Sequence, residues 1–343
     1  MAKNSLRPEI LDAATPAAAA LAVERAAALI NSGELVAMPT ETVYGLAADA
    51  TDDRAVARIY EAKGRPSFNP LIVHVADLKM ARRYVDFSPL AEKIAAEFWP
   101  GPLTLVLPRK GDAGLSLLAS AGLETLAVRA PASPLAQALI RISGKPLAAP
   151  SANRSGSISP TRADHVRDSL GDRVGLILDG GPSAVGVEST IVKVDGDRAI
   201  LLRPGGVARE AIERVTGRRL ETPERLGVEA PGMLESHYAP KARLKLNVAK
   251  PGADEAYIAF GKHDGAPARV VYNLSDRGDL VEAAANLFAH LHAADRMASA
   301  LGLYAIAVAP VPNEGLGEAI NDRLKRAAAP RGNDGKTGRQ DSA

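Results

Sequence analysis

The stretch KGRPSFNPLIVHV, residues 63–75, joins a polar loop to an apolar run. The loop carries Lys63, Arg65, Ser67 and Asn69, and two prolines restrict its backbone. The run PLIVHV has the length and composition of a buried strand. Open α/β sheets bind ligands at strand ends, so this stretch predicts an α/β fold with a ligand-binding edge.

Helix and strand signals alternate on both sides of this stretch, as expected for an α/β domain over residues 14–217. Thr15, Asp52, Ser88 and Ser133 are N-cap residues that precede predicted helices. The predicted strands are 34–39, 70–75, 103–108, 125–130, 146–150 and 174–179, followed by a hairpin around the turn DGD and a helix at 207–215.

The pattern changes after Gly217. Residues 218–243 contain three prolines and little periodicity, which predicts an interdomain linker. A smaller α/β domain is expected at 244–330 and a disordered tail at 331–343. The predicted strands of this smaller domain lie near 256–260, 269–272 and 304–309, and its predicted helices at 279–300 and 315–328.

Composition narrows the class of protein. A chain of 343 residues exceeds what one core usually serves, so two domains are expected. The lack of cysteine excludes disulfides, thiolate zinc sites and a cysteine nucleophile, and it favours a cytoplasmic location. The N-terminus has no signal-peptide pattern, and no apolar run approaches the ~18 residues of a membrane helix.

The charge distribution permits two interpretations. The net charge is only +2, but residues 54–83 hold seven basic and two acidic residues. A solvated helix face is the ordinary explanation, whereas Lys63 and Arg65 lie in a loop and favour an anion site. A non-catalytic RNA-binding module is the alternative function, although 4% aromatic residues is low for base stacking.

The common nucleotide and hydrolase motifs are absent: there is no GxxxxGK[ST], GxGxxG, HExxH or GxSxG. His290 and His292 lie two apart on a predicted helix and make a poor metal pair, so no metal ligand is assigned to the protein. Without a nucleophile–base pair, catalysis by positioning and charge stabilisation is favoured, as in phosphoryl or nucleotidyl transfer.

Four polar clusters lie at the ends of predicted strands. Each has an ordinary explanation taken singly: turn chemistry for the hydroxyls, a core histidine for His74, a structural arginine for Arg129. Together they supply the cations and hydroxyls of an anion-binding site. The clusters are Thr40, Glu41, Thr42 and Tyr44; Lys63, Arg65, Ser67, Asn69 and His74; Ser151, Asn153, Ser155, Ser157 and Ser159; and Glu188, Ser189, Thr190 and Arg203.

Seven motifs in order, PTETVYGLAADA, KGRPSFNPLIVHV, WPGPLTLVLP, LAVRAP, AAPSANRSG, VESTIV and LRPGG, resemble the YrdC-type threonylcarbamoyl-AMP synthases. The segments APGMLESHYAP and GLGEAINDRLKRAA are similar to the long, two-domain form of that family. The resemblance covers roughly residues 20–330. It implies an open twisted mixed α/β sheet with helices, plus a smaller Rossmann-like α/β domain. The related carbamoyl-adenylating maturation factors carry cysteine-rich zinc segments, which this chain lacks.

The resemblance also implies a reaction. L-threonine, bicarbonate and ATP, with Mg²⁺, would give threonylcarbamoyl-AMP and pyrophosphate. The product would pass to a separate transferase that modifies the adenosine beside the tRNA anticodon, and weak direct tRNA binding stays open.

The family's site residues map onto this chain one by one. His74 is also considered as the acceptor of a proton from the threonine ammonium. The linker would cover the site as a lid, with Leu234, Glu235 and Ser236 where the family often has basic residues. The implied threonine contacts are Thr42, His74, Arg129, Ala149 and Ser189; the implied ATP contacts are Lys63, Arg65, Asn69, Thr125, Ser151, Ser159, Arg203 and, from the linker, Tyr238.

Overall fold

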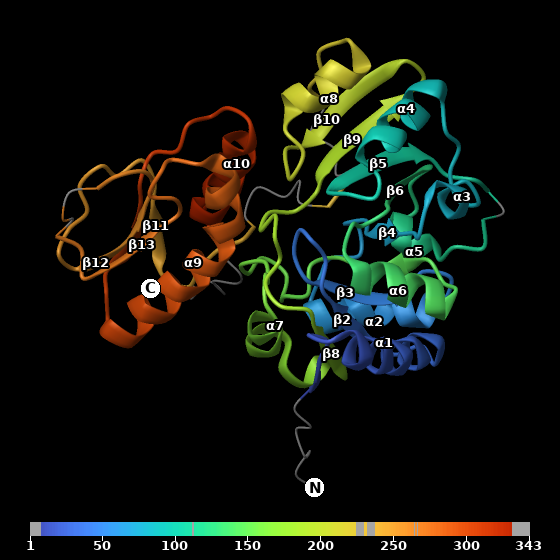
Figure 1. The fold of residues 1–343 in the computed structure, drawn as a ribbon, viewed down its shortest axis with the longest axis horizontal. Helices are drawn as coiled ribbons and strands as arrows, with labels where there is room; N and C mark the ends of the chain where they lie inside the picture. The colour runs from blue at the N-terminus through green and yellow to red at the C-terminus, as the bar shows by residue number, and fades with distance from the viewer. Residues whose placement is uncertain are drawn as a thin grey trace, which may run out of the picture.

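The computed structural model describes residues 8–111, 113–223, 230–231, 237–263, 265 and 267–330. They form two sheets, each with its own helices (Figure 1). The predicted tail at 331–343 and the linker positions Leu234, Glu235 and Ser236 lie outside the described residues.

The large sheet has ten strands in the order β1-β8-β2-β3-β7-β4-β6-β5-β9-β10. The sheet is mixed, as predicted, because four pairs are parallel (β1/β8, β2/β8, β4/β6, β5/β9) and the other five are antiparallel. The strands are β1 (Glu9–Asp12), β2 (Val36–Met38), β3 (Gly45–Asp49), β4 (Ile72–His74), β5 (Leu103–Pro108), β6 (Thr125–Arg129), β7 (Leu147–Ala148), β8 (Leu176–Asp179), β9 (Thr190–Asp195) and β10 (Arg198–Arg203).

Helices cover both faces of this sheet because its strands are buried on both sides. Alternate residues of β2 show it: Val36 and Met38 pack with α1 (Pro16–Asn31) and α6 (Pro134–Ser143), while Ala37 belongs to the opposite core with α2 (Asp53–Lys63) and α4 (Pro89–Phe98). The four predicted N-caps are confirmed, since Thr15, Asp52, Ser88 and Ser133 each accept a backbone N–H of the helix that follows.

The sequence reading missed several short elements: β1, β3, α3 (Leu78–Ala81), α5 (Leu117–Ser120) and α7 (Ala163–Leu170). The strand β3 reads GLAAD and lacks the β-branched residues that mark strands. The helix α7 reads ADHVRDSL, too short and polar for a clear apolar stripe. The predicted helix near 207–215 is α8 (Arg209–Thr216).

The C-terminal unit is a four-stranded parallel sheet in the order β11-β14-β12-β13. Its strands are β11 (Arg243–Lys245), β12 (Glu255–Ala259), β13 (Val270–Asn273) and β14 (Ala305–Val308), with the helices α9 (Leu280–Leu301) and α10 (Leu316–Ala328). β11 begins at the last residue of the predicted linker. No helix of the described residues is long and apolar enough to cross a membrane.

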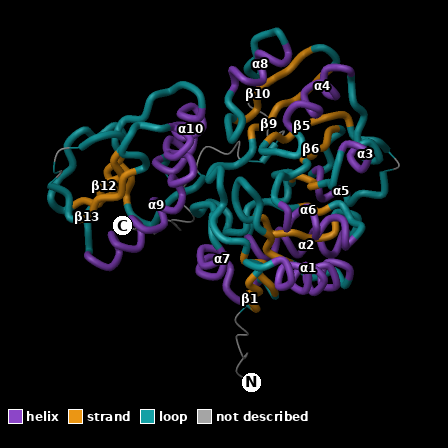
Figure 2. Tube along the Cα trace, in the orientation of Figure 1, coloured by secondary structure: helices purple, strands orange, loops and turns teal. Residues whose placement is uncertain are grey.

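Helices α9 and α10 lie between the small sheet and the large unit (Figure 2). Their apolar residues share one core with Val43, Ile158 and Val187 of the large unit. The contact is close at Gly186, where a Cβ would lie 2.4 Å from the carbonyl oxygen of Ala284 in α9. Only glycine permits this approach, so the two units pack as one body at this point.

Candidate active site

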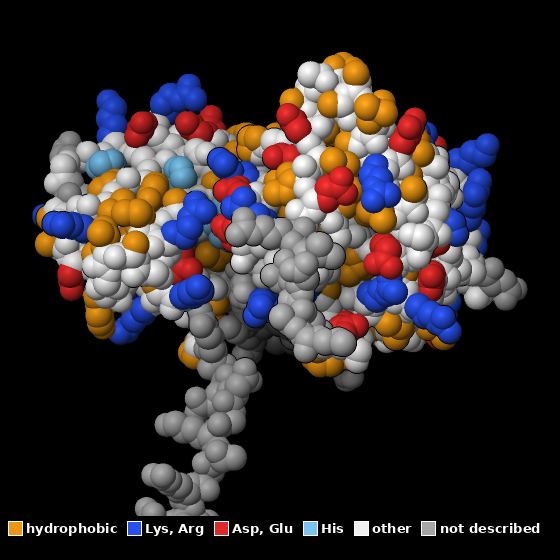
Figure 3. All heavy atoms as spheres, turned by 90° about the horizontal axis from the view of Figure 1, so that it is seen from below, with side chains coloured by type: hydrophobic (Ala, Val, Ile, Leu, Met, Phe, Trp, Pro, Cys, Tyr) orange, Lys and Arg blue, Asp and Glu red, His pale blue; other side chains and the backbone are white. Residues whose placement is uncertain are grey.

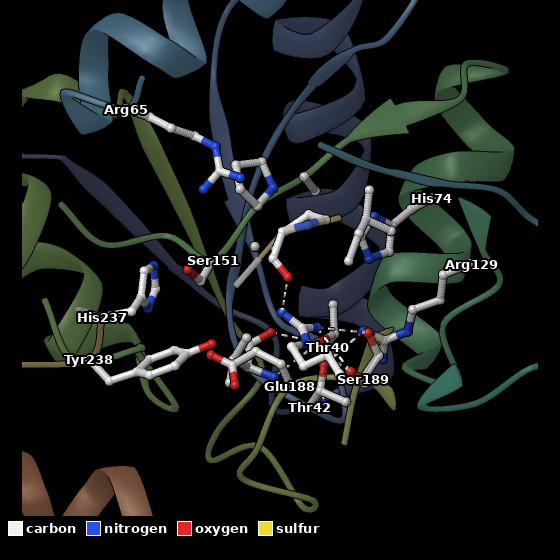
Figure 4. Close-up of a pocket in the computed structure, with 17 residues that line it drawn as sticks. Thr40, Thr42, Arg65, His74, Arg129, Ser151, Glu188, Ser189, His237 and Tyr238 are labelled. Atoms are coloured by element: carbon white, nitrogen blue, oxygen red, sulfur yellow. Dashed lines mark hydrogen bonds between the residues drawn. The ribbon is translucent and has the colours of Figure 1, made fainter. Parts of the chain in front are cut away.

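Side chains from well-separated segments surround one narrow cavity of about 50 Å³ (Figure 4). Three guanidinium groups and one carboxylate face it, so the lining is electropositive. The lining residues are Thr40, Thr42, Val43, Gly45, Arg65, Ile72, His74, Arg129, Ala149, Pro150, Ser151, Glu188, Ser189, Arg203, Pro231, His237 and Tyr238.

The strand order explains how these segments meet. β4 and β6 are parallel neighbours with His74 in register with Arg129, so both side chains leave the sheet at the same edge. Ala149 follows β7 on the other side of β4, where its N–H bonds to the carbonyl of Ile72. Ser189 directly precedes β9, and Arg203 ends its hairpin partner β10.

At one end of the cavity Arg129 is held on three sides. Its Nε donates to the carbonyl of Gly101 (3.1 Å), its Nη1 to Thr42 Oγ1 (2.9 Å) and its Nη2 to Glu41 Oε1 (2.5 Å). Burial alone would raise the pKa of the Glu41 carboxyl, but Arg129 lowers it overall and keeps it charged. The guanidinium therefore has a fixed orientation and retains further N–H groups for a carboxylate.

His74 lies beside Arg129 and is 3% exposed. Burial, and then the charge of Arg129, lower its pKa to about 3, so the ring is neutral at pH 7. Its Nδ1 has no hydrogen-bond partner among the described residues. A lowered pKa disfavours a proton-accepting role for His74, which stays a prediction. The neutral ring can still hydrogen-bond a ligand.

At the other end Arg65 is held by the turn that follows it. Its Nη2 donates to Asn69 Oδ1 (2.6 Å) and to the carbonyl of Pro70 (2.8 Å). Burial lowers the pKa of Arg65 to about 10, which leaves it charged at neutral pH. The basic cluster at 54–83 thus divides: Arg65 turns inward to the cavity, whereas Arg58 forms an exposed ion pair with Glu34.

Arg203 and Glu188 complete this end. Arg203 Nη2 donates to the carbonyl of Ser189 (2.9 Å) and its Nη1 to that of Pro231 (3.1 Å). Glu188 accepts from Ser159 Oγ (2.6 Å) and from Arg323 Nε (2.7 Å). Burial would raise the pKa of Glu188, but Arg323 and Arg203 hold it at about 2.

Four predicted ATP contacts do not reach the cavity wall: Lys63, Asn69, Thr125 and Ser159. Lys63 ends α2 with its side chain turned inward, and its Nζ donates to the carbonyls of Ser151 and Asn153 (both 2.5 Å). Through these two hydrogen bonds Lys63 supports the Ser151 loop. Burial holds the pKa of its ammonium group well below the usual range. Asn69 orients Arg65, and Ser159 orients Glu188. Thr125 begins β6, opposite Pro108.

Several functional residues were missed in the sequence. His237 and Pro231 line the cavity, and their signal was their place in the motif around Tyr238. Glu188 was singled out without a role. Arg323 was overlooked, although it falls at the spacing of the buried stripe of α10, where a charged residue needs a partner.

No metal site is evident in the described part of the chain, where no three His, Cys, Asp or Glu side chains cluster. Glu188 is the one carboxylate among the lining residues, and both of its oxygens are occupied.

Two family models match the chain. The Sua5/YciO/YrdC model, described as telomere recombination, covers residues 28–205, and the model described as threonylcarbamoyl-AMP synthase, C-terminal domain, covers 207–329. The threonylcarbamoyl-AMP synthase of Bacillus subtilis is 43% identical in an alignment of 329 residues that covers 90% of this chain and 93% of that protein.

A crystal structure of Pyrococcus abyssi Sua5 complexed with L-threonine superposes with a TM-score of 0.81 at 40% identity, covering 89% of this chain and 94% of that one. A shorter relative from Mycobacterium tuberculosis is 40% identical over 210 residues, 61% of this chain but 95% of that protein. The aligned length of this relative is about that of the large unit without the C-terminal unit. On this evidence the chain belongs to the threonylcarbamoyl-AMP synthase family, in its two-domain form.

Proposed function

We propose that this chain is an L-threonylcarbamoyladenylate synthase, which converts L-threonine, bicarbonate and ATP into threonylcarbamoyl-AMP, pyrophosphate and water. The observation that carries the proposal is the convergence of Arg65, Arg129 and Arg203 on one narrow cavity. Family membership gives the reaction class, and the cavity offers the charge that this reaction needs.

We assign L-threonine to the end that Arg129 occupies. The free N–H groups of its fixed guanidinium suit a carboxylate. The neutral ring of His74 could accept a hydrogen bond from the substrate amine at Nδ1, while Thr42, Ser189 and Ala149 line the space around it. The related Pyrococcus structure is complexed with L-threonine, which supports L-threonine as a ligand of this chain.

We assign ATP to the end lined by Arg65, Ser151, Arg203 and Tyr238. The threonine amine would attack the carbon of bicarbonate, and the adduct would lose water to give a carbamate. An oxygen of this carbamate would then attack the α-phosphate of ATP and expel pyrophosphate. Arg65 and Arg203 would neutralise the charge that builds on the departing pyrophosphate. Mg²⁺ bound to the phosphates would add further positive charge there.

The volume supports a conformational step. A cavity of about 50 Å³ is far below the roughly 300–1,000 Å³ of a typical ligand pocket. Pro231, His237 and Tyr238 of the linker region form part of its wall, so their side chains must move when ATP enters. A buried site would also protect the hydrolysable adenylate from water. We propose that the product then passes to a separate transferase acting on tRNA.

Non-catalytic RNA binding has less support from these residues. RNA phosphates need accessible cations, whereas Arg65, Arg129 and Arg203 are only 3–8% exposed. On the face in Figure 3, basic and acidic side chains are interspersed.

The test measures pyrophosphate release by the purified protein with ATP and Mg²⁺, with and without L-threonine and bicarbonate. The proposal expects release only when both are present, with threonylcarbamoyl-AMP identified by mass spectrometry. Release that depends on neither would refute it, and salt-sensitive tRNA binding without turnover would favour the RNA-binding function.

A further inference from the structure

We infer that Arg323, on helix α10 of the C-terminal unit, is a positioning residue that makes the nucleotide end of the cavity competent to bind a triphosphate. The inference rests on the proposed function. It gives the C-terminal unit a direct part in nucleotide binding.

Arg323 occupies a position where an arginine is unfavourable without compensation. It lies in the buried stripe of α10, between Ile320 and Leu324, and its side chain is 0% exposed. Removing a guanidinium from water is costly unless it gains charged partners and hydrogen bonds. The contacts that supply this compensation belong largely to the large unit.

One guanidinium contacts both segments that carry the nucleotide end. Arg323 Nε donates to Glu188 Oε2 (2.7 Å), two residues before the start of β9, and its Nη1 donates to the carbonyl of Pro204 (2.8 Å), directly after β10. Glu188 itself lines the cavity, and Arg203, which lines the nucleotide end, is the immediate chain neighbour of Pro204. Arg323 therefore fixes the hairpin segments from outside the cavity.

The same contact controls the charge of the cavity. Glu188 is 7% exposed and lines the wall. Without a counter-ion, its carboxylate would repel phosphate groups a few ångströms away in a medium that screens poorly. Arg323 offsets this charge, so Arg65 and Arg203 act on an incoming triphosphate undiminished.

Other groups nearby act differently from Arg323. Arg203 shares in offsetting the charge of Glu188, but its hydrogen bonds go to Ser189 and Pro231, so Arg323 is the arginine that binds the carboxylate directly. Asp322 accepts a hydrogen bond from Arg323 Nη1 (2.7 Å) and also from Arg326 Nε (3.0 Å), so its charge is shared between two arginines. Tyr238 lays its ring against the guanidinium, with 5.5 Å from the ring centroid to Cζ. Tyr238 also lines the cavity, which gives Arg323 a second route to the nucleotide end.

The test compares the wild type with Arg323→Met, Arg323→Lys and the double variant Glu188→Gln/Arg323→Met. Isothermal titration calorimetry gives the Kd of a non-hydrolysable ATP analogue with Mg²⁺ and, separately, the Kd of L-threonine. Thermal unfolding establishes that each variant folds. These binding measurements need no turnover.

We expect Arg323→Met to weaken the ATP analogue about 10- to 100-fold, the range typical when a supporting residue behind a ligand contact is lost. L-threonine should change less than about twofold, because Arg129 is held by other residues. The affinity of Arg323→Lys for the ATP analogue should lie between those of the wild type and Arg323→Met, because lysine keeps the positive charge but lacks the planar, forked guanidinium. The double variant should recover much of the affinity, because it removes the unpaired carboxylate.

Equal weakening of both ligands, or unchanged affinity for the ATP analogue despite a lower Tm, would overturn the inference and leave Arg323 a structural residue. If Arg323→Met does not fold, the double variant decides, because a neutral pair is tolerated where a lone buried charge is not. The inference would also be overturned if Arg323→Lys bound the ATP analogue with wild-type affinity while the double variant did not bind it. Failure of the proposed function is distinct, because the wild type itself would then release no threonine-dependent pyrophosphate.

Discussion

The two ends of the cavity are built in different ways. At the threonine end, Arg129 is held by Glu41, Thr42 and Gly101, all from the first 130 residues. At the nucleotide end, Glu188 is held by Arg323, which is 135 residues away in the chain, on helix α10 of the C-terminal unit. Under the proposed function, amino-acid recognition would be complete within the large unit, whereas the nucleotide end would depend on how the two units pack.

The largest expected effect tests the threonine end. Arg129→Gln should lower threonine-dependent pyrophosphate release about 10²–10³-fold, because the carboxylate loses its fixed charged partner. The Kd of an ATP analogue, measured by calorimetry, should stay within about twofold. Equal loss of both affinities would mean that the two ends are not separable.

The next effect tests the nucleotide end. Arg65→Gln should weaken the ATP analogue about tenfold or more, because one charge-assisted contact of about 1.5–3 kcal/mol is lost. L-threonine affinity should be nearly unchanged. Arg58→Gln is the matched control, since Arg58 lies on the exposed face of the preceding helix and pairs with Glu34. An equal effect of Arg58→Gln would point to general electrostatics instead of a site.

Acid should lower the free energy of unfolding through buried histidines at both ends of the cavity. Burial lowers the pKa of His74, at the threonine end, and of His237, near the nucleotide end, to about 3. Below pH ~6.5 the unfolded chain binds protons that these folded rings refuse, so stability is fully present above pH ~6.5 and is lost progressively toward pH 3.

The slope should be about 1.4 kcal/mol per pH unit for each of these two rings. Urea unfolding between pH 7 and pH 5 measures it. His74→Gln and His237→Gln should each reduce this slope by about 1.4 kcal/mol per pH unit, the contribution of one proton. An unchanged slope in either variant would show that the ring takes up its proton in the folded state.

The smallest expected effect marks where the nucleotide end stops. Thr125, an ATP contact by family resemblance, lies outside the cavity wall. Thr125→Val should therefore change the Kd of the ATP analogue by less than about twofold. Thr42→Val, which removes a hydroxyl that accepts from Arg129, is the comparison variant and should weaken L-threonine more clearly. A large loss of ATP affinity in Thr125→Val would extend the nucleotide end to the first residue of β6.

Much of the fold was predictable because its signals are local. The caps at Thr15, Asp52, Ser88 and Ser133 act within three residues, and the buried strands are continuous apolar runs. β3 and α7 were missed because their stabilisation comes from neighbouring elements and not from their own propensity.

The site was predictable in part for the same reason. Polar residues that directly follow a strand must lie at the sheet edge, so His74, Arg129 and Arg203 were found. The direction of a long side chain is not a local property. Lys63 turns away from the cavity to bond two carbonyls of a loop about ninety residues later, and no pattern near Lys63 encodes that choice.

By itself the sequence determined the order of elements, the polar ends of the strands and the family to which they belong. Tertiary structure alone decided which charges share the cavity, and above all that Arg323 compensates Glu188. The physical reason is range: caps and apolar periodicity act over one or two turns of chain, whereas the pairing of buried charges is settled only when both sheets have closed around them.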